Sequence, residues 1–300
     1  MTAQVIDGRK IAAALREVVA EERDTTRACG GRFGLTTISI GENAAASAYL
    51  RRIERTAEQL RVPHRSVRLD GSSPAEEVLA AIRELNGDES VSGILVLRPL
   101  PSHLDEAKVF AALDPVKDVE AVHPENAGLL ALGTPRYIPS TAAAVYHVLD
   151  SWLADMGEEP SAFYRGSRIV VVGRSNNVGK PAVSLAYAKQ SAVTSVDEWA
   201  SVGGRLGAHT RRGDVLIVAA GVPGLIRAEH VRAGAVVIDV GINIVEGEGG
   251  TPCIVGDVAL EEVVGRARAI TPVPGGVGPV TDVWLIRNTV LAARYAMGAR

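Results

Sequence analysis

Short runs of β-branched and aliphatic residues alternate along the chain with longer stretches whose apolar residues recur at helical spacing. The runs predict strands at Gly34–Ile40, Arg65–Leu69, Ser92–Val96, Arg168–Val172, Ala192–Val196, Asp214–Val218 and Ala235–Val240. The stretches between them predict helices, for example at Ile11–Val19, Ala45–Leu60 and Ala75–Leu85. This alternation is typical of βαβ units and predicts an α/β fold with parallel strands. Residues 169–172 and 215–218 are continuously apolar, so we expect helices to cover both faces of their sheet.

The polar segment Asp155–Ser167 separates two series of predicted elements and contains Gly157, Pro160 and Gly166, which favour a linker. The chain has 300 residues, enough for two domains. We therefore predict an N-terminal domain over residues 1–150 and a second α/β domain over 151–279. A last helix, near 280–300, could pack on either domain.

Composition argues against several classes of function: nucleic-acid binding, membrane association, metal binding and secretion. The net charge is −3, and lysine and arginine are spread along the chain rather than gathered in a run, which disfavours a nucleic-acid partner. The apolar segments are shorter than the roughly 20 residues that span a bilayer, so we expect no membrane partner. The six histidines and two cysteines have no metal-ligand spacing, so we expect no metal. The charged N-terminus is unlike a signal peptide, and we expect a cytoplasmic protein.

One loop carries the clearest local chemistry. A buried strand ends at Gly173, and the sequence continues through Arg174, Ser175 and Val178 to Gly179, where a helix is predicted to start. Glycines at these two places let backbone N–H groups approach a phosphate at the helix N-terminus. A tight strand-to-helix turn would look the same. The G-x-G-x-x-G fingerprint is incomplete, because Ser175 takes the place of its second glycine.

The next predicted strand ends in Asp197 and Glu198. In a dinucleotide fold, an acid at this place accepts hydrogen bonds from the ribose 2′-hydroxyl and repels a 2′-phosphate. An acidic helix N-cap is the alternative. Arg174 instead favours NADP, because its guanidinium could pair with the 2′-phosphate. We therefore expect NADP or NAD as the cofactor, and Asp197 makes NAD the favoured one.

Several longer motifs occur in a fixed order along the chain. They are Ile6–Gly8, Gly93–Val96 with Pro99–Pro101, Lys117–Val119 with His123–Pro124 and Asn126–Gly128, Pro139–Thr141, Gly173–Asn176 with Val178–Pro181, Ala219–Gly221, Val237–Asn243, Gly256–Val258, Thr271–Pro279 with Thr281, and Asn288–Thr289. In these segments the chain resembles the methylenetetrahydrofolate dehydrogenase/methenyltetrahydrofolate cyclohydrolase family over nearly its whole length. The long proline–glycine segment at 271–279 is the most specific of them.

The resemblance implies a two-domain α/β enzyme that binds folate in a cleft between an N-terminal catalytic domain and a Rossmann-like NAD(P)-binding domain. It also implies a C-terminal helix that returns to the N-terminal domain, and a homodimer. The implied substrate is a tetrahydrofolate derivative, from which a hydride passes to the nicotinamide. The implied cofactor-binding residues are Thr141, Gly173, Arg174, Ser175, Val178, Gly179, Asp197, Gly221 and Ile242. The implied substrate-binding residues are Tyr49, Glu120, Pro272, Gly275 and Gly276, of which Tyr49 and Glu120 are also the expected catalytic residues.

Many members of the family also hydrolyse the methenyl product of the hydride transfer. The sequence departs from the family pattern at the residues that this second reaction requires. The family has a lysine four residues after its tyrosine, and one helical turn places both on the same face. Here Ile53 occupies that position after Tyr49, and Leu97 occupies the position of a supporting glutamine. Glu120 stands where the family has a pterin-binding aspartate, and Asp282 and Trp284 replace small or aliphatic residues.

Isoleucine can neither donate nor accept a proton, so it cannot assist the hydrolysis of a methenyl group. Hydride transfer makes smaller demands on acid–base groups. We therefore predict a dehydrogenase whose cyclohydrolase activity is absent or very weak. Three alternatives remain: a bifunctional enzyme in which Arg52 or Arg55 acts for the lysine, a non-catalytic folate- or nucleotide-binding protein, and an enzyme with an altered, folate-like substrate.

Overall fold

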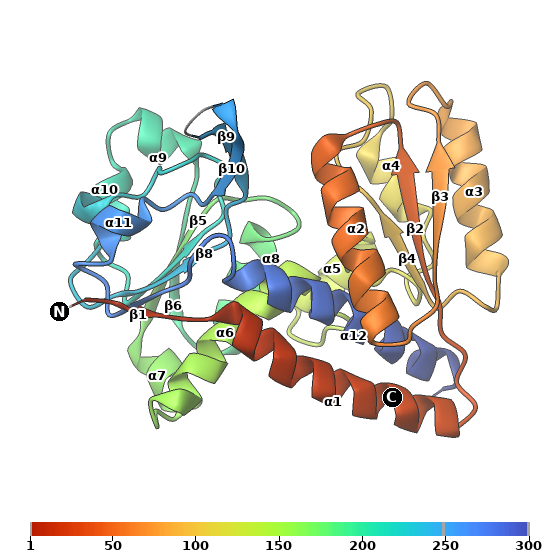
Figure 1. Cartoon of the computed structure of the whole chain (residues 1–300), viewed down its shortest axis with the longest axis horizontal. Coiled ribbons are helices and arrows are strands. Elements are labelled where there is room, and N and C mark those ends of the chain that lie inside the picture. Colours follow the sequence, from red (N-terminus) through yellow and green to blue (C-terminus); the bar gives the residue numbers. More distant parts are fainter. Residues whose placement is uncertain (1, 248–249, 299–300) are drawn as a thin grey trace. The chain divides into compact units, whose positions relative to one another are not determined.

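A computed structural model describes residues 2–247 and 250–298 (Figure 1). The chain divides into two compact units, one formed by Met1–Ala13 with Thr141–Thr281 and the other by Ala14–Ser140 with Asp282–Arg300. We call the first the nucleotide unit and the second the catalytic unit. Three long helices, α1 (Gly8–Ala28), α6 (Ser140–Asp155) and α12 (Val277–Ala296), each contain a point where the chain passes from one unit to the other. No helix among the described residues is long and apolar enough to cross a membrane.

The catalytic unit is built on a three-stranded parallel sheet with the order β3-β2-β4. Its elements are β2 (Leu35–Ile40), α2 (Ala44–Gln59), β3 (His64–Leu69), α3 (Ala75–Gly87), β4 (Gly93–Val96), α4 (Glu106–Ala111) and α5 (Pro124–Ala131). The last part of α12 belongs to this unit. There the side chain of Asn288 donates hydrogen bonds to the carbonyls of Val119 (2.7 Å) and Ile138 (2.9 Å).

The nucleotide unit contains a six-stranded, all-parallel sheet with the order β1-β11-β8-β7-β5-β6. Its strands are β1 (Gln4–Val5), β5 (Arg168–Val172), β6 (Ala192–Val196), β7 (Val215–Val218), β8 (Val236–Asp239) and β11 (Ala269–Ile270), and β9 (Asn243–Glu246) with β10 (Pro252–Val255) forms a separate antiparallel pair. Its helices are α7 (Pro160–Gly166), α8 (Gly179–Ala188), α9 (Glu198–Val202), α10 (Leu206–Thr210), α11 (Leu260–Val263) and the 3₁₀ turn η1 (Ala228–His230).

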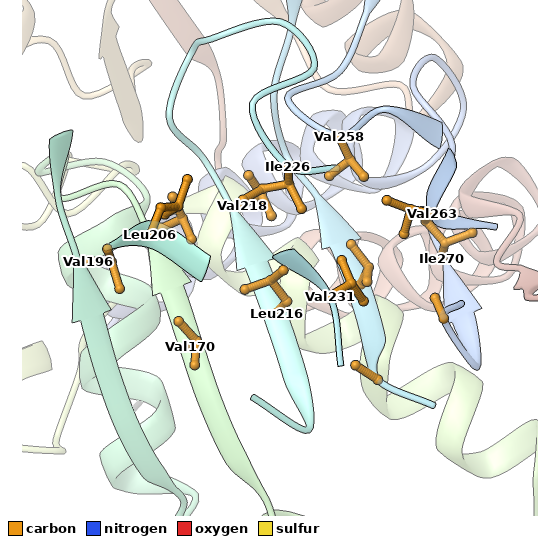
Figure 2. Packing of buried hydrophobic residues seen from close by; sticks show 14 of the residues in the cluster. Val170, Val196, Leu206, Leu216, Val218, Ile226, Val231, Val258, Val263 and Ile270 are labelled. Atoms are coloured by element: carbon orange, nitrogen blue, oxygen red, sulfur yellow. The ribbon is translucent and has the colours of Figure 1, made fainter. Parts of the chain in front are cut away.

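Apolar side chains on one face of this sheet form a continuous core (Figure 2). Val170, Leu216 and Val218 contribute from central strands, and Ile226 and Val263 join the same cluster from segments outside the strands. All five are at most 1 % exposed. Strands without polar alternation are thus buried between layers, as their sequence predicts.

The predicted strands are confirmed to within one residue at each end, and the three predicted helices are present, although α1 extends well beyond Ile11–Val19. The linker predicted at Asp155–Ser167 is wrong, because α7 occupies most of it. Glu159 caps this helix by accepting hydrogen bonds from the backbone N–H groups of Ser161 (3.1 Å) and Ala162 (2.6 Å). Pro160 follows at the first helical position, where the missing N–H costs nothing.

The unit boundaries also differ from the predicted ranges 1–150 and 151–279. Residues 1–13 belong to the nucleotide unit because β1 adds to its sheet beside β11. The division lies at Ser140/Thr141, because α6 packs against α8: the Tyr146 hydroxyl donates to the Ala182 carbonyl at 2.7 Å. Neither contact is visible in a local sequence pattern.

Candidate active site

In the nucleotide unit, the strand order reverses between β5 and β7, and the loops that follow these strands meet at one edge of the sheet. Gly173 ends β5 with φ of +108°, and a Cβ atom there would lie 2.1 Å from the carbonyl oxygen of Ala219 after β7. A Cβ atom on Gly179 would lie 2.1 Å from the Gly173 oxygen. Only glycine fits at either position. Ligands of open α/β sheets bind at such a switch point.

Between these glycines, the loop presents polar groups at the start of α8. The Ser175 hydroxyl accepts hydrogen bonds from the N–H groups of Val178 (3.2 Å) and Gly179 (3.4 Å). Asn177 Oδ1 is buried without a hydrogen-bond partner in the described part of the chain. A close backbone turn, a helix N-terminus and an unsatisfied buried acceptor together suit the diphosphate and hydroxyl groups of a dinucleotide.

A buried carboxylate fixes the neighbouring loop. Asp257 is fully buried, and its Oδ2 atom accepts hydrogen bonds from the N–H groups of Ala220 (2.6 Å) and Gly221 (2.8 Å). Its Oδ1 atom accepts one from the side chain of Asn243 at 2.8 Å. Asp257 therefore holds the turn after β7 in place opposite the Gly173 loop.

Arg174 and Asp197 meet at the carboxyl end of β6. Arg174 Nη1 donates to Asp197 Oδ2 at 2.6 Å, and its other nitrogens donate to the Ser195 hydroxyl (3.1 Å) and carbonyl (2.9 Å). Asp197 occupies the N-cap position of α9 but makes no capping hydrogen bond with its side chain. These residues line a pocket of about 220 Å³, to which Arg205 and His209 also contribute.

The proline–glycine segment folds against the start of α1 within the nucleotide unit. The Gly8 N–H donates to the Gly275 carbonyl at 2.9 Å, and a Cβ atom on Gly8 would overlap the Gly276 oxygen. Pro272 precedes this turn. Thr141 lies in the first turn of α6, and Ile242 lies just before β9 and is 55 % exposed.

In the catalytic unit, Tyr49 lies on α2, which begins where the Asn43 side chain accepts a hydrogen bond from the Ala46 N–H. Tyr49 is partly buried, whereas Ile53, one turn later, is completely buried. Leu97, which follows β4, is 4 % exposed. Ile53 and Leu97 are therefore apolar side chains shielded from water.

Glu120 also lies in the catalytic unit, two residues after Asp118. Asp118 forms a parallel β-bridge with Ile94 of β4, which places this segment beside the sheet. The Glu120 carboxylate accepts hydrogen bonds from the Ser140 hydroxyl (2.5 Å) and the Ser140 N–H (3.2 Å). Burial raises the pKa of Glu120 from its ordinary 4.5 to about 7, although the hydrogen bonds from Ser140 oppose this shift. Near neutral pH both the protonated and the ionised form of this group are therefore populated.

Tyr49 lies among charged side chains. Burial raises the pKa of its hydroxyl well above the ordinary value, and the carboxylates of Glu120 and Asp282 act in the same direction. Arg52 opposes them, with its guanidinium carbon 5.2 Å from the centroid of the Tyr49 ring. The structure thus brings together Tyr49 and Glu120, the two predicted catalytic residues.

Other polar residues of these clusters did not emerge as site residues from the sequence. Ser140 holds Glu120, and Asp257 holds the turn at Gly221, although both lie in motifs that carry the family resemblance. The contact between Arg52 and Asp282 joins positions 230 residues apart, and the unusual acid at 282 was its only sequence signal. Among the described residues, no group of three or more His, Cys, Asp or Glu side chains could hold a metal ion.

Both units match known sequence families. Residues 6–120 match the tetrahydrofolate dehydrogenase/cyclohydrolase catalytic domain, and residues 139–297 match the NAD(P)-binding domain of the same family. The chain belongs to the tetrahydrofolate dehydrogenase/cyclohydrolase family. It is therefore an enzyme with the two-domain α/β fold of that family, and the predicted family and fold class are confirmed.

Individual relatives cover the whole chain. Bifunctional protein FolD 3 of Rubrobacter xylanophilus is 54 % identical over 296 residues, which are 98 % of this chain and 93 % of that protein. The methylenetetrahydrofolate dehydrogenase-cyclohydrolase (FolD) of Trypanosoma brucei, solved with NADP and an inhibitor, is 33 % identical with a TM-score of 0.90 and full coverage of both chains. A 5,10-methylenetetrahydrofolate dehydrogenase from the silkworm Bombyx mori is 33 % identical with a TM-score of 0.88, covering 99 % of each chain.

Proposed function

We propose that this enzyme oxidises 5,10-methylenetetrahydrofolate to 5,10-methenyltetrahydrofolate with a nicotinamide dinucleotide, and that its cyclohydrolase activity is absent or very weak. One observation carries the proposal. Ile53, a buried hydrocarbon, stands one helical turn after Tyr49, while the nucleotide unit keeps a glycine cradle formed by Gly173 and Gly179, where a Cβ atom would not fit.

The dehydrogenase half rests on residues that bind and orient. Gly173, Gly179 and Gly221 would let the backbone approach the diphosphate of the cofactor, and the bound nicotinamide supplies the hydride acceptor. Tyr49 would lie against the folate, and Glu120 would hold the polar edge of the pterin. Because hydride transfer needs positioning more than proton transfer, these residues suffice for it.

The hydrolytic half lacks the lysine that the family carries one helical turn after its tyrosine. Attack of water on the methenyl carbon and opening of the ring both need a group that moves protons near Tyr49. Ile53 and Leu97 offer none. Arg52 is held by Asp282, and a guanidinium keeps its proton in proteins, so it is a poor general base.

Two assays test the halves separately. Purified enzyme with methylenetetrahydrofolate and NAD⁺ or NADP⁺ should produce methenyl absorbance, and failure with both cofactors would contradict the dehydrogenase. Added methenyltetrahydrofolate should disappear no faster than in buffer. The Ile53→Lys variant should gain hydrolysis, whereas Ile53→Met, which fills similar space without an amine, should not.

For the cofactor, we propose NAD. Asp197 places a carboxylate at the end of β6, where it would accept hydrogen bonds from a ribose 2′-hydroxyl and repel a 2′-phosphate. Arg174 is already paired with Asp197, which reduces its capacity to bind a phosphate. A larger kcat/KM for NADP⁺ than for NAD⁺ in the unmodified enzyme would contradict this preference.

We also propose a homodimer, which rests on the family resemblance and on one exposed surface. Ile244 of β9 and Ile254 of β10 are directly paired across the strands and are 61 % and 44 % exposed. A second copy of the chain would remove this apolar pair from water. Sedimentation should give a dimer for the unmodified protein and a monomer for Ile244→Lys; a monomeric unmodified protein would contradict the proposal.

A further inference from the structure

Arg52 connects two groups of the catalytic unit that come from opposite ends of the sequence. Its Nε atom donates to Asp282 Oδ2 at 3.1 Å, and its Nη2 atom lies 3.4 Å from Oδ1, so the contact is bidentate. The same guanidinium lies 5.2 Å from the centroid of the Tyr49 ring. One side chain thus links α2, which carries Tyr49, to α12, which carries Asp282.

Asp282 fixes the position of the Arg52 guanidinium because the Asp282 carboxylate is buried. Its side chain is only 8 % exposed, whereas that of Arg52 is 37 % exposed. A buried carboxylate is costly unless it is paired and hydrogen-bonded, so Asp282 requires the guanidinium where the structure places it. Seven residues later on the same helix, the Thr289 carbonyl accepts a hydrogen bond from the Ser92 hydroxyl at 3.2 Å, which anchors α12 beside β4.

The ring of Tyr49 lies beside this anchored charge. Tyr49 and Arg52 are three residues apart on α2 and therefore neighbours on its surface. A cation fixed over an aromatic face attracts the ring, and the attraction grows as water is excluded. Since Arg52 is held from its far side by Asp282, the ring has a fixed rather than a mobile cationic neighbour.

We propose that Arg52 and Asp282 act as a positioning pair that holds the Tyr49 ring in its folate-binding orientation. This inference rests on the proposed function, which places Tyr49 against the substrate. Neither residue of the pair is a catalytic residue, because both act through Tyr49. The pair gives a role to Asp282, which stands at a position where the family usually has a small or aliphatic residue.

The test compares folate binding with stability. Calorimetry with 5-formyltetrahydrofolate gives a Kd without turnover, and thermal unfolding gives a Tm. Arg52→Met and Asp282→Asn should each raise the Kd roughly 3- to 30-fold, the range that corresponds to cation–π contacts from exposed to desolvated. The double variant R52M/D282L, which leaves no unpaired charge, should recover the Tm but keep the raised Kd.

Three controls keep the outcome interpretable. Arg51→Met removes an exposed arginine from the same helix and should change neither Kd nor Tm. Arg52→Lys keeps a cation and should stay closer to the unmodified Kd than Arg52→Met does. In steady-state assays, Arg52→Met and Asp282→Asn should change the KM for methylenetetrahydrofolate and leave the KM for the dinucleotide unchanged.

Recovery of both Tm and Kd in R52M/D282L would show a purely structural role and overturn the inference. Unchanged Kd in the single variants would overturn it as well. An unmodified enzyme that binds the folate but does not oxidise methylenetetrahydrofolate would refute the proposed function alone, because the Kd comparison would still test the pair. An unmodified enzyme that binds no folate would refute both.

Discussion

Glu120→Gln gives the most quantitative test of the catalytic unit. Burial raises the pKa of Glu120 to about 7, so the folded protein binds a proton there more tightly than the unfolded chain does. The carboxyl group is neutral in both states at a pH well below 4.5. Its unfavourable contribution therefore grows as the pH rises from about 4.5 to about 7 and is constant at higher pH.

The size of this contribution follows from the shift from 4.5 to about 7. Since one pH unit corresponds to 1.36 kcal/mol, ionised Glu120 destabilises the folded state by about 3 kcal/mol at pH 8 and by about 1 kcal/mol at pH 5. Glutamine does not ionise, so Glu120→Gln removes this dependence. The variant also loses the hydrogen bond from the Ser140 N–H, which costs about 1 kcal/mol at every pH.

Urea unfolding of both proteins between pH 5 and pH 8 measures the effect. The free energy of unfolding of Glu120→Gln, relative to the unmodified protein, should rise by about 2 kcal/mol over this range. Glu84→Gln, which removes an exposed carboxylate on α3, should show little change. A difference between Glu120→Gln and the unmodified protein that is the same at pH 5 and pH 8 would refute the argument that burial governs this group.

Three further predictions concern the nucleotide unit. Gly179→Ala should cost more than about 3 kcal/mol of stability and abolish dinucleotide binding in a fluorescence titration, because its Cβ would lie 2.1 Å from a carbonyl oxygen; Gly128→Ala, with open space in α5, should instead be neutral or stabilising. Asp257→Ala should lower the free energy of unfolding by about 3 kcal/mol or more, since two backbone N–H groups lose a charged acceptor; a change below about 1 kcal/mol would contradict that role. Asp197→Ser should shift the ratio of kcat/KM values towards NADP⁺ by about tenfold, and an unchanged ratio would exclude Asp197 as the selective group.

Local sequence was sufficient for the elements that carry their own pattern. The apolar runs at β5 and β7 predicted buried parallel strands because such strands are covered on both faces. Gly173 and Gly179 predicted a close backbone turn, since no other residue tolerates it. The order of the longer motifs predicted the family, which the matches over residues 6–120 and 139–297 confirm.

Local sequence was misleading where glycine and proline are capping residues. The segment Asp155–Ser167 looked like a linker, but Pro160 begins α7 and Gly157 follows α6. Strand β1 is too short for any periodicity, and only its pairing with β11 assigns residues 1–13 to the nucleotide unit. The domain ranges therefore needed the tertiary contacts.

By itself, the sequence determined the fold class, the glycine cradle and the chemistry that position 53 lacks, because each depends on the properties of single residues or short patterns. Only the tertiary structure decided which charges meet. Arg174 pairs with Asp197, Ser140 binds Glu120, and Asp282 pairs with Arg52 across 230 positions of sequence. These partners lie far apart in the sequence, and only the tertiary fold, which no local pattern encodes, brings their side chains into contact.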